Sequence, residues 1–214
     1  TTEIIADSAG PVIGTVNVNA DYAGAYVDGT GFDITAKVTD VSVSGCEYTL
    51  DGSSWNLGLF DGANCNATGI TAADATVLTI NIRGTDNVGN IGTGSAITRT
   101  ADVNAPVVSA ITTIPTYNNA GTNFTSAIYN ITTSITDTVS PISGCEYTND
   151  SGANWMPATY NLGVCTATDV IGVDGLSYTI NMRGTDSLSR VGTGTPITRI
   201  VDFAAPTTTD DSVI

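Results

Sequence analysis

The chain has 214 residues, of which 21 are acidic and 6 are basic, so its formal charge is -15. This charge repels nucleic acid and anionic membrane surfaces, and we expect neither as a partner. Histidine is absent, which excludes Ser-His-Asp and Cys-His catalysis and histidine-ligated zinc. No apolar run approaches the roughly 20 residues that a transmembrane helix needs, so we expect no membrane insertion.

Short stretches of alternating apolar and polar residues, separated by Gly, Pro, Asn and Asp, predict β-strands along the whole chain. No stretch sustains an apolar period of 3.6 residues, so helices are not expected. The predicted strands are 11–19, 31–39, 46–50, 54–58, 75–84 and 94–101, followed by 106–114, 128–136, 145–149, 154–160, 176–184 and 194–201.

The second half of the chain repeats the first. "INIRGTDNVGNIGTGSAITRT" at 80–100 and "INMRGTDSLSRVGTGTPITRI" at 180–200 align without a gap and share 12 of 21 residues. The phrases "ADSAGP", "ADVNAP" and "VDFAAP" end at Pro11, Pro106 and Pro206 and mark three joints. A fixed period of this kind indicates tandem domains. The predicted organisation is a strand-like segment 1–7, domains 8–102 and 103–202, and a segment 203–214 that is a tail or the start of a further unit.

Six or seven short strands in about 100 residues indicate an immunoglobulin-like sandwich, so the predicted fold is all-β with two tandem immunoglobulin-like β-sandwich domains. The order "EYTLDGSSW", "RGTDNVGN" and "DVNAP" resembles the bacterial Ig-like, fibronectin III-like repeats of extracellular surface proteins. The resemblance implies secreted or cell-surface arrays such as adhesins, stalks, filaments and spacer modules of secreted enzymes. "DSLSR" at 186–190 departs from the family's Asp-x-x-Gly-Asn turn.

Four cysteines occupy matching places in the two repeats. Pairing within each repeat closes loops of about 20 residues, worth roughly 3 kcal/mol in the chain-entropy model. Zinc is the alternative, but two thiols without histidine are too few ligands. The predicted disulfides are Cys46–Cys65 and Cys145–Cys165, each fastening a Gly-rich excursion to the sheet. They indicate an oxidising, extracellular or cell-surface location.

Acidic residues recur at the joint, at the end of the second strand and in the last long turn of each repeat. In an immunoglobulin-like sandwich these places meet at the pole where the unit begins, and clustered carboxylates are ligands that calcium prefers. The alternative is structural, because Asp and Asn favour turns by bonding to the local backbone. No cofactor is required, and the candidate calcium ligands are Asp7, Asp40 and Asp86 in the first repeat and Asp102, Asp137 and Asp186 in the second.

Trp55 and Trp155 follow the hairpin turns, where packing on the sandwich and stacking on a sugar are both open interpretations. Asn-x-Ser/Thr sequons occur at several positions, and Asn66 and Asn123 are the ones predicted to carry glycans in a secreted protein.

No nucleophile–base pair or cofactor loop is visible, so we expect no enzyme. The predicted function is an extracellular structural protein, a subunit or segment of a filament, stalk or adhesin. The alternative is a carbohydrate- or protein-binding accessory module of a secreted enzyme. The predicted partners are copies of the chain or neighbouring repeats, joined through strand addition by residues 1–7, with glycans as a further class.

Overall fold

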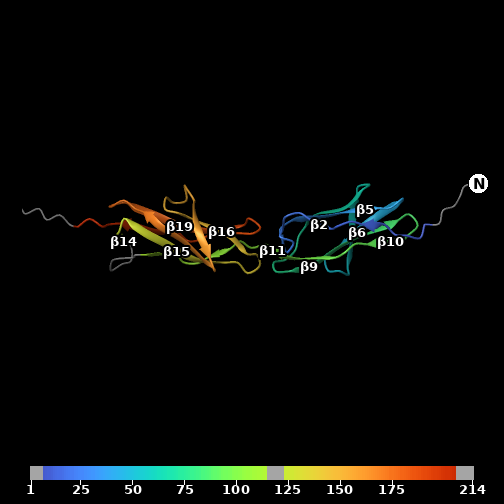
Figure 1. Cartoon of the computed structure of the whole chain (residues 1–214), viewed down its shortest axis with the longest axis horizontal. Coiled ribbons are helices and arrows are strands. Elements are labelled where there is room, and N and C mark those ends of the chain that lie inside the picture. Colours follow the sequence, from blue (N-terminus) through green and yellow to red (C-terminus); the bar gives the residue numbers. More distant parts are fainter. Residues whose placement is uncertain (1–6, 115–122, 206–214) are drawn as a thin grey trace, which may run out of the picture. The chain divides into compact units, whose positions relative to one another are not determined.

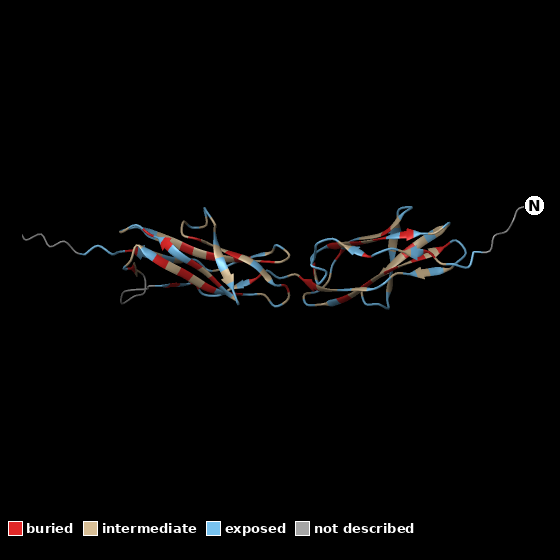
Figure 2. Ribbon diagram, viewed as in Figure 1, coloured by how far each residue is buried: buried red, intermediate tan, exposed pale blue. Residues whose placement is uncertain are grey.

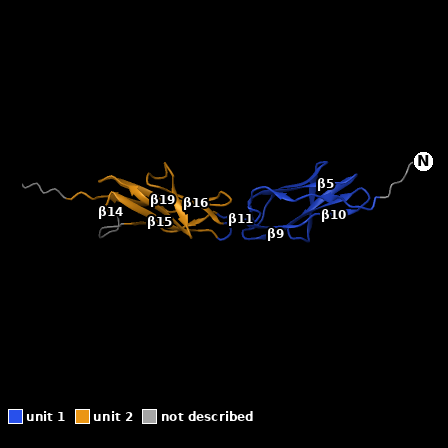
Figure 3. Cartoon of the chain, viewed as in Figure 1, with its two compact units in different colours: residues 1–104, 138–140 blue, residues 105–137, 141–214 orange. Residues whose placement is uncertain are grey.

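The computed structural model describes residues 7–114 and 123–205, and every regular element in these residues is a β-strand (Figure 1). They form two compact units, and the predicted all-β fold with two tandem sandwich domains is confirmed. Unit 1 comprises residues 1–104 with 138–140, and unit 2 comprises 105–137 with 141–214 (Figure 3).

Unit 1 is a curled sheet in which antiparallel neighbours predominate. The strand order is β1-β5-β8-β7-β6-β9-β11-β4-β3, with β2 on β5 and β10 on β9. Only the pairing of β11 with β4 is parallel among the described strands of this unit. The strands are β1 (Val12–Ile13), β2 (Asn17–Val18), β3 (Asp21–Tyr22), β4 (Tyr26–Asp28), β5 (Phe32–Thr39), β6 (Val43–Thr49), β7 (Trp55–Phe60), β8 (Asn64–Ile70), β9 (Val77–Asp86), β10 (Ile91–Thr93) and β11 (Ile97–Asp102).

Unit 2 repeats this order as β12-β15-β18-β17-β16-β19-β21-β14, with β13 on β15 and β20 on β19. The strands are β12 (Val107–Val108), β13 (Thr112–Ile114), β14 (Asn123–Phe124), β15 (Ile128–Thr136), β16 (Ile142–Thr148), β17 (Met156–Asn161), β18 (Val164–Ile171), β19 (Ser177–Asp186), β20 (Val191–Thr193) and β21 (Ile197–Val201).

Each unit has its own core, built from strand alternation. On β5 the residues Phe32, Ile34, Ala36 and Val38 are buried, and the residues between them face outward because successive side chains of a strand point to opposite faces. The alternation is visible as bands of burial along the strands (Figure 2). Full burial of one such aliphatic side chain contributes about 1.5–3 kcal/mol.

The main correction to the predicted strands concerns the segment after the β6–β7 hairpin. This segment is not a Gly-rich excursion, as its composition suggests, but the strand β8, which lies between β5 and β7 in the sheet. Cys65 and Ile70 of β8 face the core, whereas Asn64 and Asn66 lie on the outer side. Because Asn and Gly have low strand propensity, the sequence of this segment does not indicate a strand. The predicted strand 11–19 is also divided, into β1 and β2.

Candidate functional site

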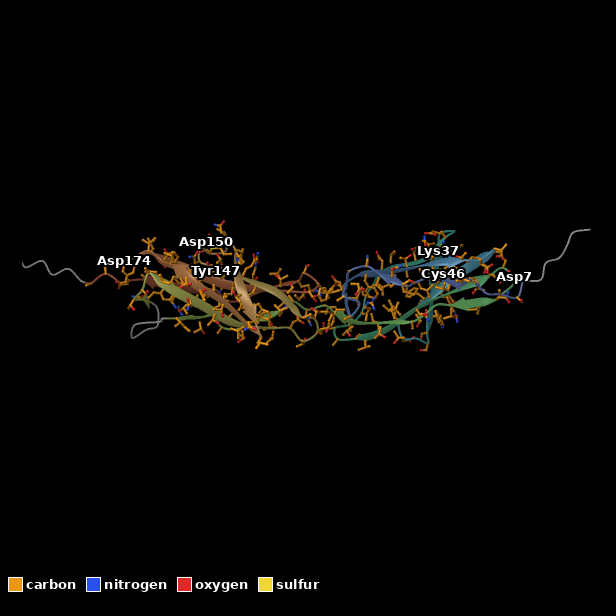
Figure 4. All side chains as sticks on the ribbon, in the orientation of Figure 1. Asp7, Lys37, Cys46, Tyr147, Asp150 and Asp174 are labelled. Carbon is orange, nitrogen blue, oxygen red and sulfur yellow. A yellow bond between two sulfur atoms is a disulfide. The ribbon has the colours of Figure 1, made fainter. Side chains whose placement is uncertain are left out.

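Both predicted disulfides are present, Cys46–Cys65 and Cys145–Cys165, with Cα–Cα distances of 5.9 and 6.2 Å. Cys46, labelled in Figure 4, lies on β6 and Cys65 lies on β8, so the bridge passes the strand β7 between them. A Cβ at Gly58 on β7 would lie 2.5 Å from the Cys65 sulfur. The disulfides therefore join two central strands of each sheet from the core side, and all four sulfurs belong to buried residues.

Asp51 and Asp150, in the hairpins that precede Trp55 and Trp155, accept hydrogen bonds that stabilise the hairpin turns. In unit 1, the backbone N–H groups of Ser53 and Ser54 donate to Asp51 Oδ1, and Thr49 Oγ1 donates to the same carboxylate. In unit 2, Thr148 Oγ1 donates to Asp150, which Figure 4 labels. The Ser54 backbone holds the pKa of Asp51 far below its usual range, and the Thr148 hydroxyl, helped by Asn154, lowers the pKa of Asp150 to about 2.

The tryptophans lie outside the two core clusters of the described residues. The guanidinium carbon of Arg83 lies 4.3 Å from the centroid of the Trp55 ring, and Arg83 Nε donates to Glu47 Oε2 at 2.7 Å. Unit 2 repeats the arrangement with Trp155, Arg183 and Glu146. A cation over an indole face is favourable by about 0.5–1 kcal/mol at an exposed site. Arg83 covers one face of the Trp55 ring, which supports hairpin packing.

The structure brings Asp7, Asp40 and Asp86 together at one end of unit 1. One carboxylate oxygen from each lies within 4.8 Å of the others. Asp7 Oδ1 accepts from the Ala9 N–H and Asp40 Oδ1 accepts from the Ser42 N–H, as in the turns of the structural alternative. We call these three residues the unit 1 trio.

Asp86 is the buried member of the unit 1 trio. Burial opposes its ionisation, but hydrogen bonds from the Asn90 backbone and side chain and from the Val88 backbone outweigh burial and lower its pKa. Asn90 Nδ2 also donates to the backbone oxygens of Asp7 and Ala9. The trio thus combines three carboxylates with nearby backbone carbonyls, a donor set that fits calcium.

The surroundings of the second predicted set, Asp102, Asp137 and Asp186, differ from those of the unit 1 trio in one residue, Arg190. In unit 2, carboxylate oxygens of Asp137 and Asp186 lie within 4.8 Å of each other, and Asp102 is buried at the end of β11 in unit 1. Arg190 stands where unit 1 has Asn90, and its Nη1 lies 3.7 Å from Asp186 Oδ2. The departure from the family's turn at "DSLSR" thus places the guanidinium of Arg190 beside a carboxylate of the second set.

The two predicted glycosylation positions lie on strands. Asn66 on β8 accepts a hydrogen bond from Thr35 Oγ1 at 2.8 Å and donates one to Asp61 Oδ2 at 2.9 Å. Asn123 begins β14 and pairs with Ile200 of β21. Glycan attachment at either position stays a prediction.

The segment that connects the units is anchored to each of them by contacts that no sequence motif predicts. In unit 1, Asp74 Oδ1 accepts from the Val103 N–H at 3.0 Å, and Asp102 Oδ1 accepts from the Asn104 N–H at 3.0 Å. In unit 2, a Cβ at Gly192 would lie 1.7 Å from the Pro106 carbonyl oxygen, so only glycine admits this approach.

The same two anchors occur at the other joints. Gly92 admits the carbonyl of Pro11 in the same way. Asp174, labelled in Figure 4, accepts from the N–H groups of Phe203 and Ala204. Gly92 and Gly192 lie in the repeated sequences "IGTG" and "VGTG", and this repetition is the sequence pattern that points to them.

No protein-family model and no curated protein matches the sequence. Among solved structures, the fibronectin(III)-like modules of Clostridium thermocellum CbhA are similar with a TM-score of 0.52 and 16% identity, covering 88% of this chain and 94% of that one. The FN1–FN3 domains of chicken CNTN1 give a TM-score of 0.45 and 10% identity, over 92% and 69% of the two chains. The D00-D0 domain of intimin gives 0.34 and 12%, over 87% and 100%.

The strand order, the two cores and the likeness to the CbhA modules together define the fold: the chain consists of two tandem β-sandwich domains of the immunoglobulin-like, fibronectin III-like class. Tandem domains of this class are typical of extracellular modular proteins, and intact disulfides belong to oxidising compartments. Within the described residues, no helix is long and apolar enough to cross a membrane.

Proposed function

We propose that the chain is a non-enzymatic segment of an extracellular structural protein, a stalk, filament or adhesin, in which each unit is a spacer that transmits force. The observation that carries this proposal is the anchoring of the connecting segment. Asn104 is hydrogen-bonded within unit 1 and Pro106 is seated on Gly192 within unit 2. One residue, Ala105, separates the two anchors, and the proline ring fixes its own φ and restricts Ala105 as well.

The disulfides support the same role. Each one joins β6 to β8, or their counterparts in unit 2, so the sheet cannot open between these strands without breaking a covalent bond. A disulfide also restricts the unfolded chain, by about 3 kcal/mol for a loop of this length. Strand addition by residues 1–7 stays a prediction, because residues 1–6 lie outside the described part of the chain.

The test of a stiff joint is the alignment of the two units in solution. Residual dipolar couplings of the full chain should fit one alignment tensor for both units. A control variant with a four-residue Gly-Ser insert after Ala105 should give two tensors of different magnitude. Two different tensors in the unmodified chain would refute the stiff joint.

Calcium at the unit 1 trio would add to this role, because a bound cation neutralises the clustered carboxylates and ties the joint residue Asp7 to the loop residues Asp40 and Asp86. It stays a prediction, supported by the donor set described above.

The alternative function, a binding module, also has an observation in its favour. The likeness to the CbhA modules concerns the fold only. Unit 1, however, has a hollow on one outer sheet face, lined by six polar residues together with Val18 and Ile34.

A further inference from the structure

The outer face of the β2–β5–β8–β7 sheet of unit 1 carries a distinct set of side chains. Because Ile34 and Ala36 of β5 face the core, Asp33, Thr35 and Lys37 face outward. The register places Asn17 opposite Thr35, Thr35 opposite Asn66, and Asn66 opposite Leu59. Residues opposite each other on neighbouring strands have Cβ atoms about 4.5–5.5 Å apart. Asn17, Thr35, Asn66 and Leu59 therefore form one continuous row across four strands.

A hollow of about 440 Å³ lies on this face. Its volume is within the range of small-ligand sites, roughly 300–1,000 Å³. The polar residues that line it offer amide, hydroxyl and carboxylate groups, and they are Asn17, Asn19, Asp33, Thr35, Asn66 and Thr68.

These polar side chains hold one another in place. Asn19 Nδ2 donates to Asp33 Oδ2 at 2.9 Å, and the Asp33 N–H donates back to Asn19 Oδ1. Thr35 Oγ1 donates to Asn66 Oδ1. Each amide nitrogen has a second hydrogen and each carboxylate oxygen a second lone pair, so the groups can still bind a ligand. Groups fixed in advance reduce the ordering cost of binding.

Two leucines of β7 add exposed aliphatic surface to the same outer face. The side chains of Leu57 and Leu59 on β7 are 86% and 71% exposed, and Leu59 is the register neighbour of Asn66. On the far side of Leu57, Glu47 is neutralised by its ion pair with Arg83. The face thus combines amide, hydroxyl and carboxylate groups with exposed aliphatic surface.

Unit 2 shows that this set is not needed for the fold. In the same register, Thr112 pairs with Thr132 and Thr132 with Thr166, whose hydroxyls lie 3.4 Å apart. Thr159 of β17, paired with Thr166, stands where unit 1 has Leu59. A purely structural ladder would not require Asn at two of these places and an exposed leucine beside them.

From this geometry we propose that the outer face of unit 1 binds a neutral oligosaccharide. A pyranose presents hydroxyls at its edge, which match the Asn, Asp and Thr groups, and an apolar C–H face, which matches Leu57 and Leu59. Among the residues that the structure describes, Asp33 is the one carboxylate lining the hollow. The chain's charge of -15 disfavours uronic acids and sulfated sugars. This site goes beyond the spacer function and does not depend on it.

The test is a titration of the isotope-labelled, bacterially produced full chain with cellohexaose, xylohexaose and chitohexaose, followed by amide chemical shifts. At least one probe should shift the signals of residues 17–19, 33–35, 59 and 66–68 in a saturable way. Their counterparts in unit 2 should not move. Oligogalacturonate, as an acidic probe, should leave all signals unchanged.

The variants install the residues that unit 2 itself uses, so folding is expected to survive. Asn66→Thr and Leu59→Thr should each weaken binding about tenfold, because each removes one contact. Val77→Ser on β9, which also installs the unit 2 residue at an exposed position outside the hollow, should leave binding unchanged. The proposal is overturned if none of the three neutral probes shifts these signals, if the shifts map to another face, or if the two hollow variants bind like the wild type.

Discussion

Replacing Gly192 by alanine tests the seat of the joint in unit 2. The new Cβ would lie 1.7 Å from the carbonyl oxygen of Pro106, far inside the 3.0 Å below which such contacts are essentially never seen. The atom in the way belongs to the backbone, so no side-chain rotation relieves the clash. Overpacking of this kind costs about 1–3 kcal/mol, and in a domain of this size each kcal/mol lowers Tm by about 4–8 °C. Unit 2 should therefore melt roughly 5–20 °C lower.

The assay is differential scanning calorimetry of the full chain, in which unit 1 serves as the internal reference. Gly144→Ala is the matched control, because nothing lies within 4 Å of its Cβ position and its φ is not in the left-handed region. We expect the unit 2 transition to separate from that of unit 1 in Gly192→Ala and to stay in place in the control. Equal melting of the two variants would refute the argument that the Pro106 carbonyl is seated on Gly192.

Three further outcomes are expected. Replacing Cys46 and Cys65 together by alanine should destabilise unit 1 by about 3 kcal/mol and leave unit 2 unchanged in calorimetry; equal loss in both units would contradict separate cores. Hydrogen bonds, from the Asn64 backbone first, lower the pKa of Asp61 to about 2, and that of Asp150 is also about 2. Because both pKa values lie below the ordinary value near 4, the ionised forms of Asp61 and Asp150 stabilise the folded protein fully above pH 4, and this stabilisation is lost as the pH falls through 2. Urea unfolding between pH 5 and 2 would measure the loss. A free energy of unfolding that does not change over this range would contradict the prediction. Calcium should raise the Tm of unit 1 relative to chelator, and Asn90→Arg, which copies unit 2, should abolish the rise; no calcium effect in the wild type would exclude the site.

Local patterns of the sequence were enough for the fold class, the duplication and both disulfide pairs. Alternation along 31–39 and 128–136 predicted β5 and β15 because a half-buried strand imposes a period of two residues. The convergence of Asp7, Asp40 and Asp86 was also predictable, since loops at one end of a sandwich meet whatever their spacing in the chain. The exchange of Asn90 for Arg190 was visible in the sequence, but the 3.7 Å approach of its guanidinium to Asp186 was not.

Tertiary structure alone decided the position of β8, the glycine seats at Gly92 and Gly192, and the composition of each outer face. These features depend on which residues lie opposite one another on strands that are distant in sequence, and a shift of one residue would exchange the inner and outer faces. Nothing in the sequence connects Leu59 with the sequon residue Asn66, and the two become neighbours on one exposed surface only through the pairing of β7 with β8. Amino-acid type determines whether a segment becomes a strand, whereas register between distant strands determines what the folded surface presents.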